Sequence, residues 1–370
     1  MSGLAQKRKK TSFAARSGGK TTPLSGKKKS GGKSVPARRK KGLNWPVIVA
    51  AGVLLATYAI VVLFNGFHWS GWQEGWDDLK DSARTLLQAV QSAFGQLEAD
   101  TPDGLVFDPP AGGEVRVHFI DVGQGDCILI EGSGESVLID AGENDQGDEV
   151  LGYLSAAGIE DIDLAVGTHP HSDHIGGMDT VLEGITVGRL MLSDVPDSIV
   201  PTTRTYLDLL DAAEETGTEM FYGYPGDQVS ICGGTLTVLG PVEDYDDLND
   251  ESLVIRFDYG ESSFLFTGDE ESGAEEDLLA SGADIGADVL KVGHHGSDTS
   301  SSEEFLRAVG PEIAVIECGE GNDYGHPHLE VLERLEAVSA AVYRTDLDGS
   351  VVVTADGSGN YDASTAEGRP

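Results

Sequence analysis

Side chains that bind metal ions are concentrated in one short segment, THPHSDHIGG at residues 168–177. His169, His171, Asp173 and His174 lie within six positions of one another. Imidazole nitrogens and carboxylate oxygens suit zinc, manganese or iron. In a tight loop, alternate residues can point toward two neighbouring ions, whereas a structural role would require four separately satisfied polar groups. The segment therefore predicts a metal site.

The elements that must position this segment follow an α/β pattern. Apolar runs predict strands over residues 115–121, 126–131, 136–140 and 161–167, and a helix over 147–157. The strands are joined as hairpins, unlike the regular βαβ rhythm of a nucleotide-binding fold. The metal-binding segment begins directly after the fourth strand. Gly176 and Gly177 then allow close helix–strand packing after the loop.

The motif H-x-H-x-D-H after a strand resembles the metallo-β-lactamase superfamily. Further segments match in order: HFIDVGQGDCILIE, THPHSDHIGG, LNDESLVIRFDYGESSFLFTGD, VLKVGHHGS, YGHPH and RTDLDGSVVV. Together they resemble the C-terminal hydrolase domain of ComEC-type DNA-uptake (competence) proteins, over roughly residues 114–356. The resemblance implies a four-layer αββα sandwich with the site at one edge of the paired sheets.

The same resemblance implies roles for residues outside the segment. Asp140 matches an aspartate that supports the metal loop, and Asp269 matches a carboxylate that bridges two metals. His294 matches the late histidine ligand, in preference to His295. The implied second metal site consists of Asp173, His174, Asp269 and His294.

The implied first metal site is short of one histidine. It would contain His169, His171 and Asp269, because no histidine lies between His174 and His294. Asn249 or Ser252 would complete it, directly or through water. Asp173 would be a ligand that also orients the attacking water. The expected cofactors are two divalent ions, zinc or manganese.

Other polar residues are candidates for substrate contact or support. His326 could bind a substrate phosphate or protonate the leaving oxygen; alternatively, it is a loop histidine before a helix that begins near His328. Lys291 could contact phosphate or be a strand residue at a sheet edge. Asp121, Gln124 and Asp126 would support the site floor through hydrogen bonds or simply form a tight hairpin.

Charge divides the chain into two parts. The 370 residues include 63 acidic and 25 basic side chains, for a net charge of −38. Fourteen of the basic residues lie between Lys7 and Lys41, and residues 1–44 contain no acid. This segment predicts a disordered, basic cytoplasmic tail that binds anionic lipid or nucleic acid. The remainder is strongly acidic.

An apolar run follows the tail. Val47–Phe64 is 18 residues without a charge, with Trp45 before it and Trp69 after it. This predicts a transmembrane helix over 45–66, in contact with membrane lipid. The preceding positive charges place the N-terminus in the cytoplasm and the following residues outside it.

Residues after the apolar run divide into a stem, a linker, a domain and a tail. Apolar residues at 4-3 spacing predict a helical stem over 69–99, either a parallel coiled coil that makes a homodimer or a helix lying on the domain or the lipid. A Pro/Gly-rich linker follows at 100–113. The hydrolase domain then extends over 114–356 and a flexible tail over 357–370.

These features predict a single-pass membrane-anchored, metal-dependent hydrolase outside the cytoplasm. A phosphodiesterase acting on a nucleic acid or nucleotide is the leading function, with two metals activating water. The acidic domain disfavours long nucleic acids, whose binding depends on neutralising phosphates. One span also departs from the multi-helix channel of ComEC-type proteins. The alternatives are a hydrolase of esters, lactones or lactams and a non-catalytic DNA-uptake accessory protein.

Overall fold

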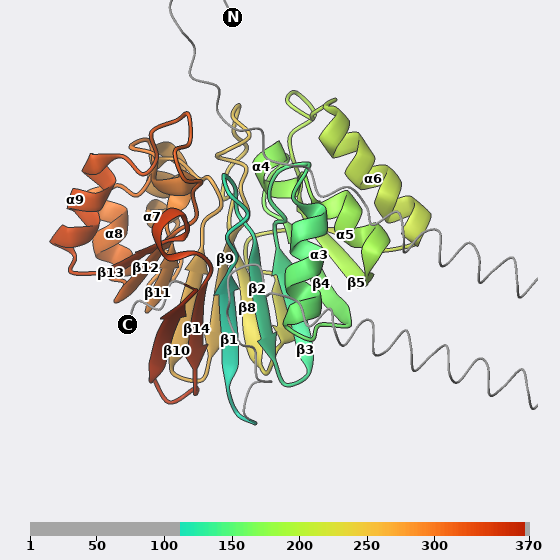
Figure 1. Cartoon of the computed structure of the whole chain (residues 1–370). Helices are drawn as coiled ribbons and strands as arrows, with labels where there is room; N and C mark the ends of the chain where they lie inside the picture. The colour runs from blue at the N-terminus through green and yellow to red at the C-terminus, as the bar shows by residue number, and fades with distance from the viewer. Residues whose placement is uncertain (1–111, 367–370) are drawn as a thin grey trace, which may run out of the picture. The chain divides into compact units, whose positions relative to one another are not determined.

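Two β-sheets packed face to face form the centre of the protein (Figure 1). The computed structural model describes residues 112–366. The first sheet has the strand order β15-β14-β1-β2-β3-β4-β5-β6. In that order its strands are Tyr361–Thr365, Val351–Ala355, Val115–Phe119, Ile128–Gly132, Glu135–Ile139, Asp161–Gly167, Thr186–Ser193 and Glu219–Gly223.

The second sheet has seven strands in the order β13-β12-β11-β10-β9-β8-β7. In that order they are Ala341–Arg344, Ile313–Ile316, Val289–Lys291, Ser262–Phe266, Val254–Tyr259, Gly234–Gly240 and Gln228–Ile231. Each sheet combines antiparallel and parallel pairing: β3 to β6 are parallel in the first sheet, and β10 to β13 in the second. Parallel neighbours end at the same edge, so the loops that follow them meet there.

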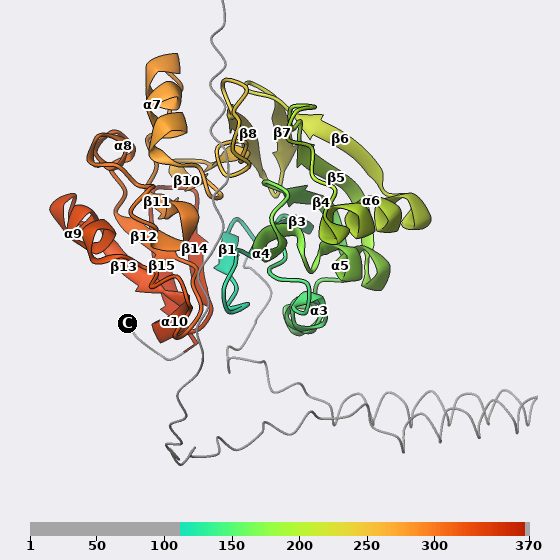
Figure 2. The same cartoon turned by 90° about the horizontal axis from the view of Figure 1, so that it is seen from above.

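Helices cover the outer face of each sheet, as the view from above shows (Figure 2). The first sheet carries α3, α4, α5 and α6, which are Gly147–Ala156, Ser172–Ile175, Met178–Gly184 and Arg204–Thr216. The second half of the chain contains α7, α8, α9 and α10, which are Ser272–Ser281, Glu303–Val309, Leu329–Ala337 and Thr345–Asp348. Between β11 and α8 lies a short 3-10 turn, η1 (Gly293–Gly296).

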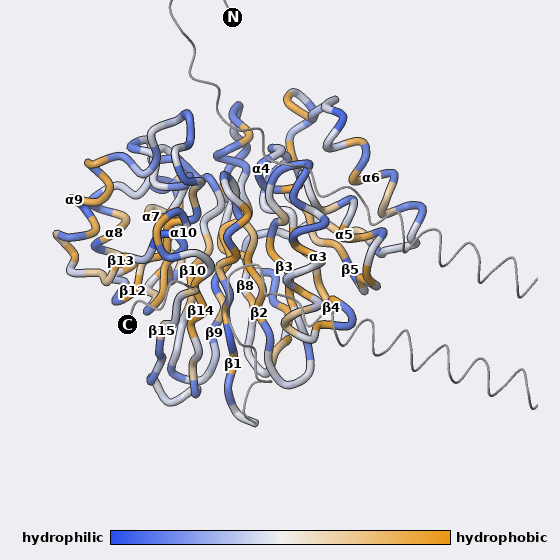
Figure 3. The backbone as a smooth tube through the Cα atoms, in the orientation of Figure 1, coloured by the Kyte–Doolittle hydropathy of each residue, from blue (hydrophilic) through white to orange (hydrophobic). Residues whose placement is uncertain are grey.

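The apolar residues form three buried layers between the four layers of secondary structure. The central layer lies between the sheets and includes Phe119, Phe257, Phe264 and Phe266. A second layer packs the first sheet against α3, α5 and α6, and a third packs the other sheet against α7, α8 and α9. Apolar segments accordingly follow the central strands, while many of the loops at the edge are hydrophilic (Figure 3). The αββα sandwich is therefore confirmed.

Local predictions for the first half of the domain hold closely. The four predicted strands appear as β1 to β4, and the predicted helix over 147–157 is α3. The flexible tail predicted from residue 357 is wrong for Tyr361–Thr365, which pairs with β14 as β15. Tyr361 and Ala363 point toward the inter-sheet core, which explains why this segment joins the sheet.

Several predictions concern residues that precede the described domain. The basic tail, the membrane span at 45–66, the stem at 69–99 and the linker up to residue 111 lie outside the described residues. Among residues 112–366, no helix combines the length and apolar character needed to cross a bilayer.

Candidate metal centre

The histidine-rich segment lies at the edge where several strand-ending loops meet. It follows β4 and includes the short helix α4. Asp140 follows β3, Asp269 follows β10, and His295 lies in the turn after β11. The loops after parallel strands therefore bring together side chains that are more than a hundred positions apart in the sequence.

His169 and His171 form the first part of the centre. His169 Nε2 lies 3.0 Å from His171 Nδ1. The hydroxyls of Thr168 and Ser252 each lie 3.2 Å from the opposite ring nitrogen, His169 Nδ1. Ser252 also accepts a hydrogen bond of 3.1 Å from the Asp269 amide. Ser252 thus orients the His169 ring from behind, rather than lying beside Nε2 as a ligand would.

Protonation favours metal binding by His169. Burial, reinforced by the neighbouring imidazole of His174, lowers the pKa of His169 well below its ordinary value. The ring is therefore neutral at neutral pH, which is the form that binds a metal ion.

His174 forms the second part of the centre and is held from behind by a carboxylate. Its Nδ1 lies 2.8 Å from Asp140 Oδ2, and its Nε2 lies 3.2 Å from Asp269 Oδ1. Asp140 also accepts hydrogen bonds from the amide and hydroxyl of Thr168, at 2.8 and 2.7 Å. A carboxylate that fixes the outer nitrogen of a histidine leaves the inner nitrogen for a metal. Asp140 therefore contacts both the Thr168 end of the histidine-rich segment and the His174 ring.

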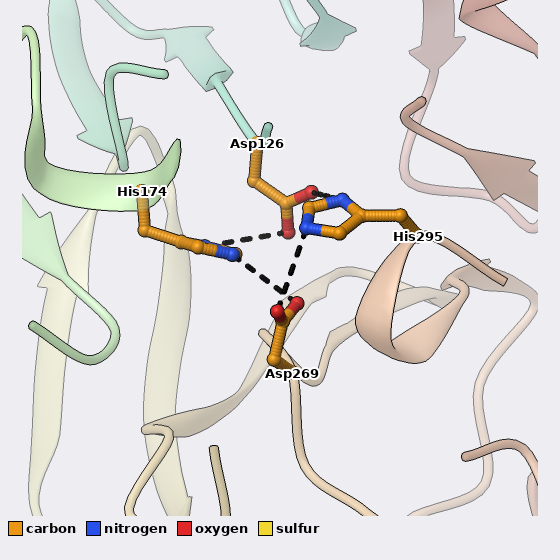
Figure 4. A group of neighbouring side chains, drawn as sticks. All are labelled: Asp126, His174, Asp269 and His295. Carbon is orange, nitrogen blue, oxygen red and sulfur yellow. Dashed lines mark ion pairs between the residues drawn. The ribbon is translucent and has the colours of Figure 1, made fainter. Parts of the chain in front are cut away.

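His295 completes this group. Its Nδ1 lies 2.9 Å from the Glu317 carbonyl oxygen, to which it can donate a proton. Its Nε2 lies 3.3 Å from Asp173 Oδ2 and 3.4 Å from Asp269 Oδ2. Figure 4 shows His174 and His295 on two sides of Asp269, with Asp126 across from Asp269. Ligand atoms of these four residues all lie within 4.8 Å of one another.

The sequence favoured His294 over His295, and the structure brings both to Asp269. His294 Nε2 is 3.7 Å from Asp269 Oδ2, while its Nδ1 is 3.3 Å from Glu271 Oε1. His294 is partly exposed, whereas His295 is buried. Both residues have left-handed backbones, with φ of 48° and 53°. Such a conformation costs about 1–3 kcal/mol at a non-glycine residue and is concentrated at functional sites.

The donor set fits divalent metal ions. Among the described residues, buried atoms of this group without a hydrogen-bond partner are His174 Nε2, His295 Nε2, Asp269 Oδ1 and Asp126 Oδ1. Buried polar atoms are normally paired, so unpartnered imidazole and carboxylate atoms that lie this close together fit a bound cation. Burial raises the pKa of Asp269, but the two histidines outweigh it and hold the pKa well below its ordinary value. Mixed imidazole and carboxylate ligands suit zinc, manganese or iron.

A pocket of about 320 Å³ opens onto Asp269 and His295 of this group. It is lined by Gln124, His171, Ser172, Asp173, Asn249, Asp269, His294, His295, Tyr324 and His326. None of these ten residues is a lysine or an arginine, so the lining contributes no permanent positive charge. Anion binding in this pocket would therefore depend on metal ions and on polar hydrogens.

His326 and Tyr324 lie side by side in the lining of this pocket. Their rings stack with centroids 5.6 Å apart and an angle of 22° between planes. The side chain of Asn322 hydrogen-bonds both the amide and the carbonyl of His326, at 3.0 and 2.7 Å, and so fixes the loop. Burial, together with neighbouring histidines, lowers the pKa of His326 to about 4. The predicted substrate-contact residue thus faces the pocket as a neutral imidazole at neutral pH.

The other predicted residues divide between the site and its surroundings. Asn249 and Gln124 line the pocket, and Asn249 Oδ1 is buried without a partner. The Asp121 carboxylate accepts a hydrogen bond of 3.0 Å from the Gly123 amide and stabilises the turn. His328 Nδ1 accepts one of 2.9 Å from the Asp298 amide, directly before α9. His328 is not among the residues lining the pocket.

Two residues near the site were missed or misplaced by sequence reasoning. Tyr324 is 66% exposed and was not singled out, although it begins the segment YGHPH. Lys291 was expected to contact phosphate or to lie at a sheet edge. It is instead fully buried at the end of β11, between β10 and β12, and it does not line the pocket.

The fold agrees with a comparison to known families. Residues 120–319 match the Lactamase_B domain of the metallo-beta-lactamase superfamily, and the chain belongs to that superfamily. The resemblance inferred from the sequence motifs is therefore confirmed.

The curated relatives include a competence protein and a protein named for the ComE operon. ComE operon protein 3 of Bacillus subtilis (strain 168) is 35% identical over 262 residues, which are 66% of this chain and 33% of that protein. Competence protein ComA of Neisseria gonorrhoeae is 32% identical over 248 residues, covering 64% and 32% of the two chains. This chain thus spans about a third of the length of these relatives.

One solved structure that this chain matches is that of CmlA from Streptomyces venezuelae, described as a diiron beta-hydroxylase. It is 16% identical to this chain, with a TM-score of 0.44, and the match covers 67% of this chain and 55% of that one.

Proposed function

We propose that this protein is a metal-dependent phosphodiesterase. The observation that carries the proposal is the convergence of buried, unpartnered ligand atoms of His174, His295 and Asp269, the last two of which line a pocket. His169 and His171 would hold a first divalent ion with Asp269. Asp173, His174, Asp269 and His295 would hold a second, with His294 at its margin.

The protein's own groups would bind and orient the substrate around these ions. Two divalent ions, zinc or manganese, would activate water at neutral pH and neutralise charge on a phosphodiester. Asp173, whose carboxylate lines the pocket, would also accept a hydrogen bond from the attacking water. His326 and Asn249 would contact the substrate oxygens from the opposite wall. Thr168, Ser252 and Asp140 would keep the histidine rings in place.

The charge of the pocket favours a diester over a monoester. Asp173 and Asp269 contribute two carboxylates to the lining, which contains no lysine or arginine. A phosphodiester carries one negative charge at neutral pH, whereas a monoester carries nearly two. The second charge would have no cationic side chain to pair with in this pocket. The exposed ring of Tyr324 offers a surface on which a nucleobase could stack, so a nucleotide or a short oligonucleotide is the substrate class we favour.

The segments before the domain suggest where the enzyme acts. The uncharged run Val47–Phe64 after a basic tail supports a single membrane span over residues 45–66, with lipid as a partner. The hydrolase domain would then lie outside the cytoplasm. The apolar seam at 69–99 supports a homodimer through the stem.

A second function is favoured by the relatives' names. Two of them are called competence proteins or products of a competence operon, ComA and ComE operon protein 3. A non-catalytic accessory role in DNA uptake would be consistent with those names. A hydrolase of esters, lactones or lactams is the remaining alternative, because one scaffold can support several chemistries.

Turnover of bis-p-nitrophenyl phosphate by the full chain tests the proposal. We expect hydrolysis that requires zinc or manganese and is lost in His169→Ala. Arg204→Ala is the control, because the Arg204 side chain is exposed and pairs with Asp208 on α6, outside the pocket, and it should retain activity. Bound metal without phosphodiester turnover would instead direct attention to esters, lactones and lactams. Absence of both metal and turnover would favour the accessory role.

A further inference from the structure

A buried lysine lies behind the metal centre. Lys291 has no exposed surface, and its Nζ is 2.7 Å from Asp126 Oδ2. The same ammonium group donates a 2.9 Å hydrogen bond to the Val292 carbonyl oxygen. Burial lowers the pKa of Lys291, but the carboxylates around it outweigh burial and raise the pKa. The lysine therefore stays charged and is not used to bind substrate.

The partner of this lysine faces the outer nitrogens of both histidines. Asp126 Oδ1 lies 3.1 Å from His295 Nδ1, and Asp126 Oδ2 lies 3.9 Å from His174 Nδ1. The inner nitrogens, Nε2, face Asp269 instead, as Figure 4 shows. Asp126 thus lies on the Nδ1 side of each ring, away from the Nε2 atoms that face Asp269, and its own Oδ1 is buried without a hydrogen-bond partner. Its position suits a group that orients ligands better than one that binds the metal.

The backbone ties Asp126 to the metal-binding loop. Its amide donates a 3.1 Å hydrogen bond to the Asp173 carbonyl oxygen, and its own carbonyl accepts one of 2.9 Å from Gly142. The preceding Gly125 has φ of 134°, and a Cβ there would lie only 2.2 Å from the Asp173 carbonyl oxygen. Only glycine allows this approach. The turn DVGQGD therefore holds the Asp126 carboxylate between the two histidine-bearing loops.

We propose that Lys291 and Asp126 are a positioning pair that fixes the rings of His295 and His174 for divalent-metal binding. Asp126 faces the Nδ1 sides of both rings, and Lys291 fixes that carboxylate from the second sheet. The inference rests on the metal-binding part of the proposed function and does not depend on which substrate is cleaved.

Two substitutions and their combination separate this role from simple stability. Lys291→Met alone leaves the Asp126 carboxylate buried without its partner, which endangers folding. Asp126→Asn removes the charge but keeps an oxygen near His295. The double variant Lys291→Met with Asp126→Asn removes both charges together, a change that proteins tolerate far better than loss of one partner. Glu131→Gln is the matched control, because Glu131 forms a buried pair with His118, 3.1 Å apart, outside the centre.

The experiment measures metal affinity of the full chain by competition with a chelator, for zinc and for manganese. Cobalt(II) absorption reports the ligand geometry, and unfolding of the metal-free proteins reports stability. We expect Asp126→Asn and the double variant to bind at least one ion 10- to 100-fold more weakly, with altered cobalt spectra. Glu131→Gln should bind metal as the unmodified chain does.

Unmodified affinity and cobalt spectra in Asp126→Asn and the folded double variant would overturn the proposal. So would a loss of metal-free stability without any change in metal affinity, because that result assigns the pair a purely structural role. An unmodified chain that binds no metal would overturn both this inference and the proposed function. An unmodified chain that binds metal but does not cleave phosphodiesters would contradict only the proposed reaction. The metal affinities of the variants could still be compared.

Discussion

Substituting Asp140 by Asn replaces one carboxylate oxygen with an NH₂ group. The groups around this carboxylate all donate hydrogen bonds to it. The buried carboxylate accepts from the Thr168 amide at Oδ1, and from the Thr168 hydroxyl and His174 Nδ1 at Oδ2. An asparagine amide can accept at only one of these positions. It must therefore place its NH₂ group against at least one existing donor.

The two orientations have different consequences. With NH₂ at the Oδ1 position, the Thr168 amide is left unsatisfied, which costs about 1–3 kcal/mol of stability. With NH₂ at the Oδ2 position, the Thr168 hydroxyl can rotate to accept, but His174 must move its proton from Nδ1 to Nε2. That proton would then point at Asp269, 3.2 Å away, and would block metal binding. Loss of such a supporting carboxylate typically weakens metal binding about 10- to 100-fold.

Urea unfolding of the metal-free chain and chelator competition measure the two consequences separately. We expect Asp140→Asn to lose about 1–3 kcal/mol of unfolding free energy, at least 10-fold in metal affinity, or both. Asp163→Asn is the matched control on the same sheet, because Asp163 accepts one backbone bond of 2.9 Å, from Ser136, which an amide oxygen can retain. Unchanged stability together with unchanged metal affinity in Asp140→Asn would refute the reasoning.

Three further substitutions give distinct expected results. Gly125→Ala should lower the thermal unfolding midpoint and the metal content, because its Cβ would lie 2.2 Å from the Asp173 carbonyl oxygen; an unchanged midpoint would contradict this. Tyr324→Ala should raise KM for a dinucleotide about 5- to 150-fold, because it removes about 1–3 kcal/mol of stacking on a nucleobase. Tyr324→Phe keeps an aromatic ring and should retain KM. Equal KM values for the two variants would contradict stacking of a nucleobase on Tyr324. Burial raises the pKa of Glu275, against opposing hydrogen bonds from Ser302. The native state then holds this proton to higher pH than the unfolded chain, so the stability that Glu275 contributes falls as pH rises from about 4 toward its raised pKa. The unfolding free energy of Glu275→Gln should lack this part of the pH dependence. Parallel pH profiles of unfolding free energy for Glu275→Gln and the unmodified chain would refute this expectation.

Local pattern predicted the elements that carry the histidine-rich segment. Strands β1 to β4 follow short apolar runs, and β4 ends where the metal-binding residues begin. The pairing of β15 was not predicted, because Tyr361 and Ala363 find their partners in the inter-sheet core and not in neighbouring sequence. Periodicity in a short, polar C-terminal segment carries little information about such distant contacts.

The residue types of the candidate metal centre could be predicted from the sequence, but the orientation of the individual side chains could not. The spacing of His169 to His174 identified a metal centre, but the choice between His294 and His295 depends on two left-handed backbones in η1. No residue type in HHG reveals which ring turns inward. Lys291 was misplaced for a related reason, because a lysine is rarely buried unless it is paired. Its partner, Asp126, is 165 positions earlier in the chain and meets it only through the packing of two sheets.

Anomalous diffraction from crystals of the full chain grown with zinc would test the central claim most directly. The account predicts two zinc peaks, one beside His169 Nε2 and His171 Nδ1 and one beside His295 Nε2 and Asp173, with Asp269 between them. It also predicts that Asp126 stays paired with Lys291 and does not contact either ion. A peak coordinated by Asp126 with Lys291 displaced, or no peak among these side chains, would contradict the account.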